Sequence, residues 1–381
     1  MDFFPIPGQA GRMLTFTPGQ DGYETEIAGF QTGVPSKPQL VVGATSADDV
    51  AEAVRYAADR DLPVSVQATG HGLREPATGV LISTRRMTAV SIDPARAVAR
   101  VEAGATWGAV IEAAATYGLA PLSGSSPGVG VVGYTLGGGF SLMGRRYGLA
   151  ADHVVAAESV APDGTRGAGL DGVVTSLEFG LFPVTTLYGG ALSFTATENA
   201  LRTWRDWTAD LPDTLTTSLA LVPYPDLPMI PEPLRGKHIA QVRVAYPGPA
   251  DEGARLVSPL RALGPVMDTL APLPFTKSGT IAAEPPNPHA YLGDNRTLSS
   301  LSEESVDAIL TAAESPVVLI LDLLGGAYAP GRHLAPGSRY AVRALSTPDP
   351  DVPGMGQEKL FEAFAPTATG RLASFVYGQP L

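Results

Sequence analysis

The chain has 381 residues, of which 26 are basic, 38 are acidic and 44% are hydrophobic, for a formal net charge of −12. This hydrophobic content suffices for a sizeable core, so global disorder is not expected, and the length predicts two domains or one large domain. The acidic balance disfavours a nucleic-acid partner, because no basic patch would displace counterions from phosphates. The absence of cysteine excludes disulfides, thiolate nucleophiles and cysteine-ligated metals.

The N-terminal residues 1–14 lack a basic stretch followed by an apolar core, so no signal peptide is predicted. The longest apolar run, Val317 to Leu324, is interrupted by Asp322 and is too short to span a bilayer. We therefore expect a cytoplasmic protein without a membrane partner; its oligomeric state stays unknown.

The first part of the chain mixes helices and strands. A helix is predicted after Ser46, because apolar residues follow at helical spacing, and a strand is predicted over residues 64–66. Residues 90–92 and 98–101 predict a hairpin, and Thr106 precedes a helix that Gly118 ends.

Residues 121–139 hold seven glycines in nineteen residues. They show neither strand nor helix periodicity, and so predict a long loop whose backbone approaches a ligand closely. A strand candidate, Val173 to Phe179, follows this loop, and the segment around Pro183 resembles a domain boundary.

The second part of the chain, from about residue 187, has a different pattern. Trp204 and Trp207 share one face of a predicted helix. The expected helices cover residues 201–211, 250–263 and 303–313, and the expected strands cover residues 219–222, 239–244, 317–321 and 340–345. These elements predict a second α+β layer.

Two segments carry candidate chemistry. His71 lies between glycines just after a predicted strand, so its imidazole can reach a ligand; the alternative is an ordinary surface histidine. Residues Gly128, Gly130 and Gly133 spell the G-x-G-x-x-G of dinucleotide-binding folds, with Asp152 at the spacing of a ribose-binding acid. The context disfavours that interpretation, because Ser-Gly-Ser-Ser-Pro precedes the motif and Gly137 to Gly139 would end a helix. A turn-rich loop without a ligand is the remaining alternative.

Several of these motifs together resemble a known family. Residues 64–72, Arg85-Arg-Met87 and residues 101–105 are similar to the FAD-binding domain of the vanillyl-alcohol-oxidase/PCMH superfamily, and residues 121–152 to its berberine-bridge-enzyme-like branch. The resemblance implies an α+β fold with a PCMH-type FAD-binding domain over residues 1–186. It also implies an antiparallel-sheet substrate domain over residues 187–381. Relatives carry a further stretch between Thr165 and Arg166, and a C-terminal segment that returns to the flavin domain; both are expected to be absent here.

The resemblance implies FAD as the cofactor, with a single 8α-histidyl bond through His71, since Ser126 stands where many relatives carry a second, cysteinyl link. It places Val129 as the gate for O2 beside the flavin and Tyr134 near the pyrimidine ring. The remaining implied FAD contacts are Gln67, Ala68, Thr69, Gly70, Gly72, Ser123, Gly124, Ser125, Gly128, Gly133, Gly137, Gly138, Gly172 and Val174.

The function implied is two-electron oxidation of a small organic molecule, an alcohol, sugar or secondary metabolite, with O2 as acceptor. Tyr134 and Tyr328 are the predicted catalytic residues, the latter as a base if its pKa is lowered; a core tyrosine is the alternative for Tyr328. No residue spacing predicts a metal site. A pocket covered by apolar strands predicts a neutral or modestly polar substrate. Three alternatives stay open: a non-redox cyclase that keeps FAD, a nicotinamide-dependent dehydrogenase that uses Gly128–Gly133, and a binding module without flavin.

Overall fold

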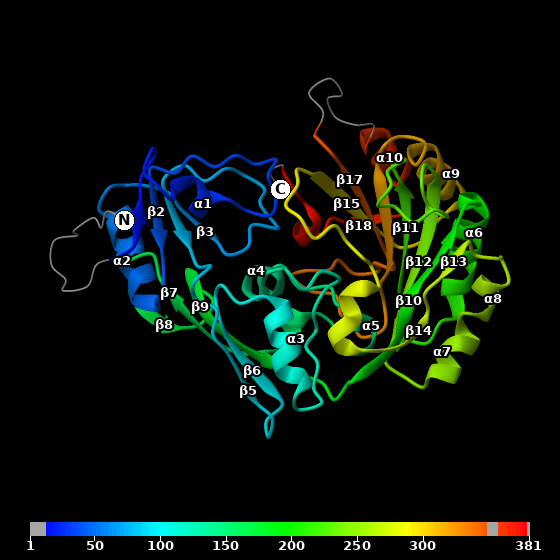
Figure 1. The fold of residues 1–381 in the computed structure, drawn as a ribbon, viewed down its shortest axis with the longest axis horizontal. Coiled ribbons are helices and arrows are strands. Elements are labelled where there is room, and N and C mark those ends of the chain that lie inside the picture. Colours follow the sequence, from blue (N-terminus) through cyan, green and yellow to red (C-terminus); the bar gives the residue numbers. More distant parts are fainter. Residues whose placement is uncertain (1–12, 349–356, 379–381) are drawn as a thin grey trace.

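The computed structural model describes residues 13–348 and 357–378. Its strands form three sheets of four, five and nine strands, and helices lie beside each of them (Figure 1). The first two sheets use strands that end by residue 180, and the third uses strands that begin at residue 186. This mixture of helices and mainly antiparallel sheets confirms the predicted α+β class.

The four-stranded sheet leads into the His71 loop. Its central strands pair in parallel, and its order is β1 (Thr15–Phe16), β2 (Leu40–Gly43), β4 (Val80–Ser83) and β3 (Val64–Gln67). The short helix α1 (Tyr23–Ile27) and the predicted helix α2 (Ala47–Ala58) lie beside it. Helix α2 begins after Ser46, as the sequence predicts, and the structure adds that Ser46 and Asp49 form a reciprocal capping box.

The five-stranded sheet is antiparallel and contains the predicted hairpin. Its order is β5 (Val90–Asp93), β6 (Val98–Glu102), β9 (Val173–Gly180), β7 (Val154–Val160) and β8 (Arg166–Ala168). Trp107, the first residue of α3 (Trp107–Ala115), is fully buried at the centre of the core beneath this sheet. Three short helical segments follow α3 and lead to β7: α4 (Val131–Leu136), α5 (Gly144–Tyr147) and the 3-10 helix η1 (Ala150–His153).

The nine-stranded sheet is wholly antiparallel. Its strands are β13 (Met267–Asp268), β10 (Thr186–Phe194), β12 (His238–Tyr246), β11 (Thr216–Pro223), β16 (Val318–Leu323), β17 (Tyr340–Ser346), β15 (Leu292–Leu298) and β18 (Ala368–Gly370), in this order, and β14 (Ala271–Pro274) pairs with β10. These strands confirm the four predicted in this part of the chain.

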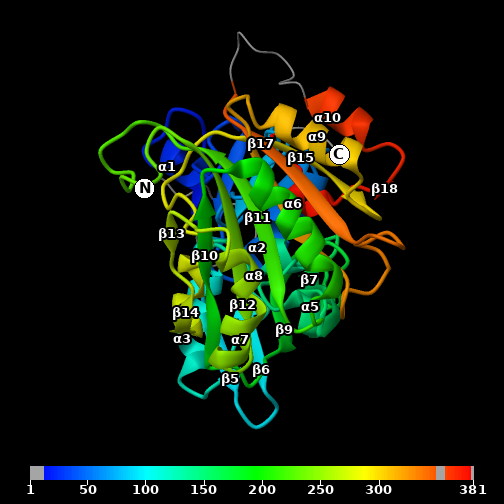
Figure 2. The ribbon, with the colours of Figure 1, turned by 90° about the vertical axis from the view of Figure 1, so that its right-hand side faces the viewer.

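Helices cover one face of this sheet (Figure 2). The helices on this face are α6 (Thr197–Trp207), α7 (Ala250–Leu256), α8 (Ser258–Arg261), α9 (Glu303–Ala312) and α10 (Gln357–Ala363). The 3-10 segments in this part of the chain are η2 (Thr208–Asp210), η3 (Phe275–Thr280) and η4 (Ala373–Phe375), and Phe275 of η3 packs instead into the core that contains Trp107. Trp204 and Trp207 pack into the same core, as predicted. The single helix expected over 250–263 is instead two helices, because Pro259 at the start of α8 lacks the N–H that a continuous helix needs.

Hydrogen bonds join the part of the chain that holds the nine-stranded sheet to the N-terminal unit, residues 13–180, and two sets of them bear on the predictions. The buried guanidinium of Arg145 donates to the carbonyls of Leu215, at 2.8 Å, and of Leu324. The C-terminal segment reaches the His71 loop, where the Gly378 N–H donates to the Leu73 carbonyl at 3.1 Å. The described chain therefore does return to the N-terminal unit, which the sequence did not lead us to expect.

Within the described residues, no helix combines the length and the apolar composition needed to cross a membrane.

Candidate functional site

The loop that follows β3 is held against residues 27–30. The Gln67 side-chain amide donates to the carbonyls of Ile27 and Ala28, at 3.2 and 3.1 Å. Gly70 has a φ of 71°, and a Cβ placed there would lie 2.6 Å from the Gly29 Cα. Only glycine fits this close approach with this backbone conformation, so the position of the next residue, His71, depends on it.

The His71 imidazole is neutral and has one free nitrogen. Its ring stacks on Phe30 with centroids 3.9 Å apart, and its Nδ1 lies 2.9 Å from the Thr69 hydroxyl. Its Nε2 is buried and has no hydrogen-bond partner among the described residues. Burial lowers the pKa of His71 to about 4, an effect that His289 reinforces and Glu284 opposes. The ring is thus unprotonated at neutral pH and available to bond a ligand.

The glycine-rich loop meets this histidine. A Cβ on Gly128 would lie 3.7 Å from the His71 Cε1 and 3.8 Å from its Nε2. The Gly130 N–H donates to the Thr69 hydroxyl at 3.3 Å. The structure therefore brings the two segments that the sequence singled out into contact, although they are about sixty residues apart in the chain.

The end of the glycine-rich segment is helical, contrary to expectation. Gly130 is the N-cap of α4, which continues to Leu136, and Gly137 caps its other end. Gly133 lies inside α4. Because packing rather than intrinsic helix propensity stabilises so short a helix, one glycine does not prevent it from forming. An isolated bridge at Ala120 and a loop precede the helix rather than a paired strand, so the strand–turn–helix context of a dinucleotide fingerprint is missing.

Several buried polar atoms in or near this loop have no partner among the described residues, and they include the Ser123 Oγ, the Tyr134 hydroxyl and the Trp107 Nε1. The Tyr134 ring packs edge-on against Trp107, with centroids 5.2 Å apart. Burial, with a contribution from Tyr328, raises the pKa of Tyr134 well above its ordinary value, so its hydroxyl stays protonated as a donor. Unpartnered buried polar atoms are uncommon, and a flat ring bearing donors and acceptors would satisfy them. The residues present therefore fit a flavin.

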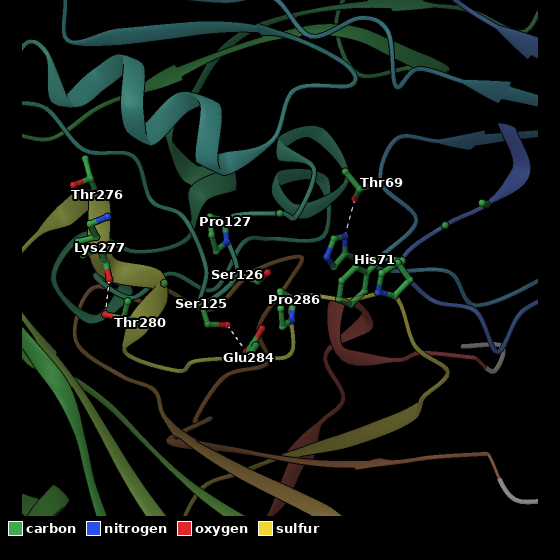
Figure 3. A pocket seen from close by; sticks show the side chains of 16 residues that line it. Thr69, His71, Ser125, Ser126, Pro127, Thr276, Lys277, Thr280, Glu284 and Pro286 are labelled. Atoms are coloured by element: carbon green, nitrogen blue, oxygen red, sulfur yellow. Dashed lines mark hydrogen bonds between the residues drawn. The ribbon is translucent and has the colours of Figure 1, made fainter. Parts of the chain in front are cut away.

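A cavity of about 670 Å³ opens beside His71. Figure 3 shows Thr69 and His71 on one side of it and Ser125, Ser126 and Pro127 on another. The Ser125 hydroxyl donates to the Glu284 carboxylate at 2.6 Å, which ties the glycine-rich loop to the segment after η3 (Figure 3). The cavity is lined by Ala28, Gly29, Phe30, Thr69, His71, Ser125, Ser126, Pro127, Gly128, Thr276, Lys277, Gly279, Thr280, Glu284, Pro286 and Pro288.

The other residues that the sequence predicts as FAD contacts differ in their surroundings. Val129 is half-buried, and its carbonyl accepts the Trp107 N–H at 3.0 Å. Gly72 and Gly133 face open space, and a Cβ on Gly124 would lie 3.0 Å from the Tyr134 ring. Ala68 lies against Gly130, and Gly138 lies against His333.

Two predicted contacts have packing partners instead. A Cβ on Gly172 would lie 2.0 Å from the Val160 carbonyl oxygen, so this glycine permits a tight strand turn. Val174 is buried in the core of the five-stranded sheet, together with Leu177. Asp152 also has a structural partner, since its carboxylate accepts the Leu149 N–H at 3.1 Å.

Tyr328 lies outside the cavity lining. It is buried, its hydroxyl donates to the Ser141 carbonyl at 3.2 Å, and its ring contacts Phe140. Burial raises the pKa of Tyr328, with Asp322 adding to the shift. Tyr328 was predicted to act as a catalytic base only if its pKa were lowered, and its pKa is raised instead.

The face of the nine-stranded sheet opposite its helices carries charged side chains as well as apolar ones. The Arg343 guanidinium pairs with Asp322 at 2.8 and 3.1 Å and lies over the Phe375 ring, 4.3 Å from its centroid. Arg243 lies on the same face. The expectation of an apolar roof is therefore wrong, because polar residues at alternate positions of β12, β16 and β17 turn away from the helix-covered core. That alternation, as in Gln241-Val-Arg243, was the signal that could have revealed them; nothing in the sequence singled out Glu284.

Comparison with known proteins identifies the N-terminal unit. Residues 38–166 match the model of an FAD binding domain. Over 166 residues the chain is 36% identical to (R)-6-hydroxynicotine oxidase of Paenarthrobacter nicotinovorans, covering 38% of this chain and 36% of that relative.

Solved structures extend the likeness to the whole fold. The 6-hydroxy-D-nicotine oxidase of Arthrobacter nicotinovorans aligns with a TM-score of 0.81 and 23% identity, over 95% of this chain and 89% of the other. The wild-type BBE-like 1 protein of Physcomitrella patens aligns with a TM-score of 0.81 and 17% identity, over 96% and 89%. The chain therefore contains an FAD-binding domain related to those of FAD-linked oxidoreductases, and it shares its overall fold with the 6-hydroxy-D-nicotine oxidase and the BBE-like 1 protein.

Proposed function

We propose that this chain is an FAD-dependent oxidase that removes two electrons from a small organic molecule and uses O2 as the acceptor. The observation that carries the proposal is the buried, neutral His71 imidazole, whose unpartnered Nε2 faces the glycine-rich loop. FAD, when bound, takes a hydride from the substrate and returns the electrons to O2, which gives H2O2. The printed name of the nicotine-oxidising relative supports an oxidase.

The proposal assigns residues 1–186 to FAD binding and residues 187–381 to substrate binding. His71 would hold the cofactor through a single covalent bond to its 8α-methyl group, and its free Nε2 supports this role. A second bond is not proposed, because the chain has no cysteine. Gly70 and Gln67 would position His71, and Ser123 and Tyr134 would offer polar atoms to the ring system.

Val129 supports O2 as the acceptor. It follows Pro127 by two residues, at the position that the family resemblance assigns to the gate beside the flavin. Its side chain is short and half-buried against the core that contains Trp107. A small residue there leaves space for O2, whereas a bulkier one would fill that space.

Tyr134 would act as a neutral hydrogen-bond donor that stabilises negative charge on the reduced cofactor. Its raised pKa suits a donor and not a base. Tyr328 enters the proposal as its neighbour, since the two phenols interact electrostatically. We expect Tyr134→Phe to lower the rate of flavin reduction by about 10-fold or more with little loss of stability. Stopped-flow absorbance checks this, with Tyr328→Phe as the paired variant.

The proposed function is tested by the visible spectrum and oxygen consumption of the purified protein. We expect a yellow protein whose acid-precipitated pellet stays yellow, and which produces H2O2 with at least one member of a panel of alcohols, sugars and sugar acids. A yellow protein that forms no H2O2 with any compound would favour the cyclase. A colourless protein that binds NAD would favour the dehydrogenase, and one that binds neither cofactor would favour a binding module.

A further inference from the structure

The strand β12 presents one row of side chains to the N-terminal unit. Val242 and Val244 pack into the core under the helices. Ala245, on the opposite face, packs into the core that contains Trp107. Because side chains alternate along a strand, Arg243 shares the face of Ala245. It therefore lies on the side of the sheet that faces the cradle, the name used here for His71 and the glycine-rich loop, residues 121–139.

Arg243 is the cation on this face that has no acidic partner. Its Nε donates to the Gln241 side-chain oxygen at 2.9 Å. Among the described residues, neither of its terminal nitrogens makes a hydrogen bond, and no carboxylate lies within ion-pair distance of it. Burial lowers the pKa of Arg243, which Glu284 partly opposes. Desolvating a guanidinium without a partner is unfavourable, so the side chain is suited to a ligand that brings the partner.

Arg343 provides the contrast within the same sheet. Asp322 engages it through both carboxylate oxygens, so its charge is already matched. Ser218 of β11 pairs with Arg243 on one side and with Asp322 on the other. The two backbones are therefore two strand spacings apart, about 9–10 Å. Asp322 is engaged by Arg343, and among the described residues it makes no ion pair with Arg243, although its charge still acts on that side chain.

The surrounding charges indicate which anion fits. Arg243 and Arg343 are balanced by Asp322 and by Glu284, which acts on both arginines and lines the cavity. A single negative charge can pair with Arg243 at close range, whereas the second charge of a dianion would only add to the negative charge of Asp322 and Glu284. A planar guanidinium fork matches a carboxylate through two parallel hydrogen bonds. The Tyr224 phenol, close enough to Arg243 for their charges to interact, is a second donor.

We infer that Arg243 is a specificity-determining residue that binds a carboxylate group of the substrate, so that the enzyme oxidises a small organic monocarboxylate rather than a neutral sugar or alcohol. This inference rests on the proposed function, and replaces the neutral substrate that the sequence led us to expect. The carboxylate would lie between the Arg243 fork and the Tyr224 hydroxyl. The carbon to be oxidised would lie toward the cradle formed by His71 and the glycine-rich loop.

The test uses the purified holoprotein and pairs of probes that differ only in charge: benzoate against benzamide, and glucuronate against glucose. Binding is followed by the shift of the visible spectrum and by thermal unfolding, at millimolar probe. We expect one or both carboxylates to bind at least 10-fold more tightly than their neutral partners. Arg243→Gln should weaken that binding by about 10- to 100-fold while leaving the neutral probe unchanged.

Arg296→Gln is the matched control, because Arg296 lies over the Phe361 ring on the helix side of the same sheet. It should leave carboxylate binding unchanged, and Arg243→Lys should recover part of it. Equal binding of acid and neutral probes, no binding of either carboxylate to the wild type, or unchanged binding in a folded Arg243→Gln would overturn the inference. A colourless protein that still binds carboxylates through Arg243 would reject the proposed oxidase while keeping the carboxylate site.

Discussion

The two sides of the candidate site are built by different means. On the cradle side, glycines and backbone contacts bring the His71 loop against residues 121–139, and the buried polar atoms there are neutral and unpartnered. On the sheet side, charged residues occupy alternate strand positions; Arg343 and Asp322 pair at close range, whereas Arg243 has no acidic partner among the described residues. A cradle of neutral groups suits a flat, uncharged ring system, whereas the charged face can discriminate among substrates. The difference teaches that cofactor retention and substrate choice should be separable by mutation.

The cradle side predicts the largest effect. His71→Ala removes the imidazole nitrogen proposed to bond the flavin, so no covalent flavin should remain. The acid-precipitated pellet should turn from yellow to colourless, as measured by its absorbance. His289→Ala is the control, because this exposed histidine also lies against Phe30 and should leave the pellet yellow. A yellow His71→Ala pellet would reject the covalent link.

The joint between the two sides predicts the next effect. Arg145 is buried and donates to the carbonyls of Leu215 and Leu324, so Arg145→Ala would leave both buried acceptors unpaired. We expect the free energy of unfolding to fall by about 3–5 kcal/mol. Its ion-pair partner Asp213 is mostly exposed, so Asp213→Asn should cost less than about 1 kcal/mol. Urea unfolding measures both, and equal losses would mean that the ion pair dominates.

Two neighbouring glycines sharpen the account of the cradle. Gly70→Ala forces a side chain into the left-handed region and into contact with Gly29, and should lower the free energy of unfolding by about 2–4 kcal/mol. Gly72→Ala meets no atom within 4 Å and should change it by less than about 0.5 kcal/mol. Thermal unfolding compares the two variants. Similar melting temperatures would show that the His71 loop can relax without its contact to Gly29.

The smallest effect is a pH dependence from His71. Its pKa is about 4 when folded and 6.5 when unfolded, so the unfolded chain binds more protons between these values. Stability should therefore fall as the pH drops from 6.5 to 4, by about 1–2 kcal/mol after allowance for partial solvent exposure. Urea titrations of flavin-free wild type and His71→Gln should show the wild type losing more. Parallel curves would mean that His71 is solvated.

The sequence by itself determined the local elements that periodicity and capping specify. The capping box of α2, the hairpin of β5 and β6, and the tryptophan face of α6 all follow from neighbouring residues. It also singled out His71 and the glycine-rich loop, because glycines beside a reactive side chain indicate close approach to a ligand. The short helix α4 was not predicted, because Gly130, Gly133 and Gly137 give its sequence a low helix propensity. Its stability comes from packing on Trp107, which the local sequence does not reveal.

Only the tertiary structure decided which distant residues meet. Pairing in the nine-stranded sheet aligns Arg243 with Ser218 and Asp322, and η3 and the turn after it bring Glu284 to Ser125. The same packing leaves Tyr328 buried against Ser141 and carries the C-terminal segment to Leu73. Strand pairing and loop contacts between residues far apart in the chain are not encoded in local periodicity. The charged face of the sheet, and the absence of an acidic partner for Arg243 among the described residues, therefore appear only once the sheet is assembled.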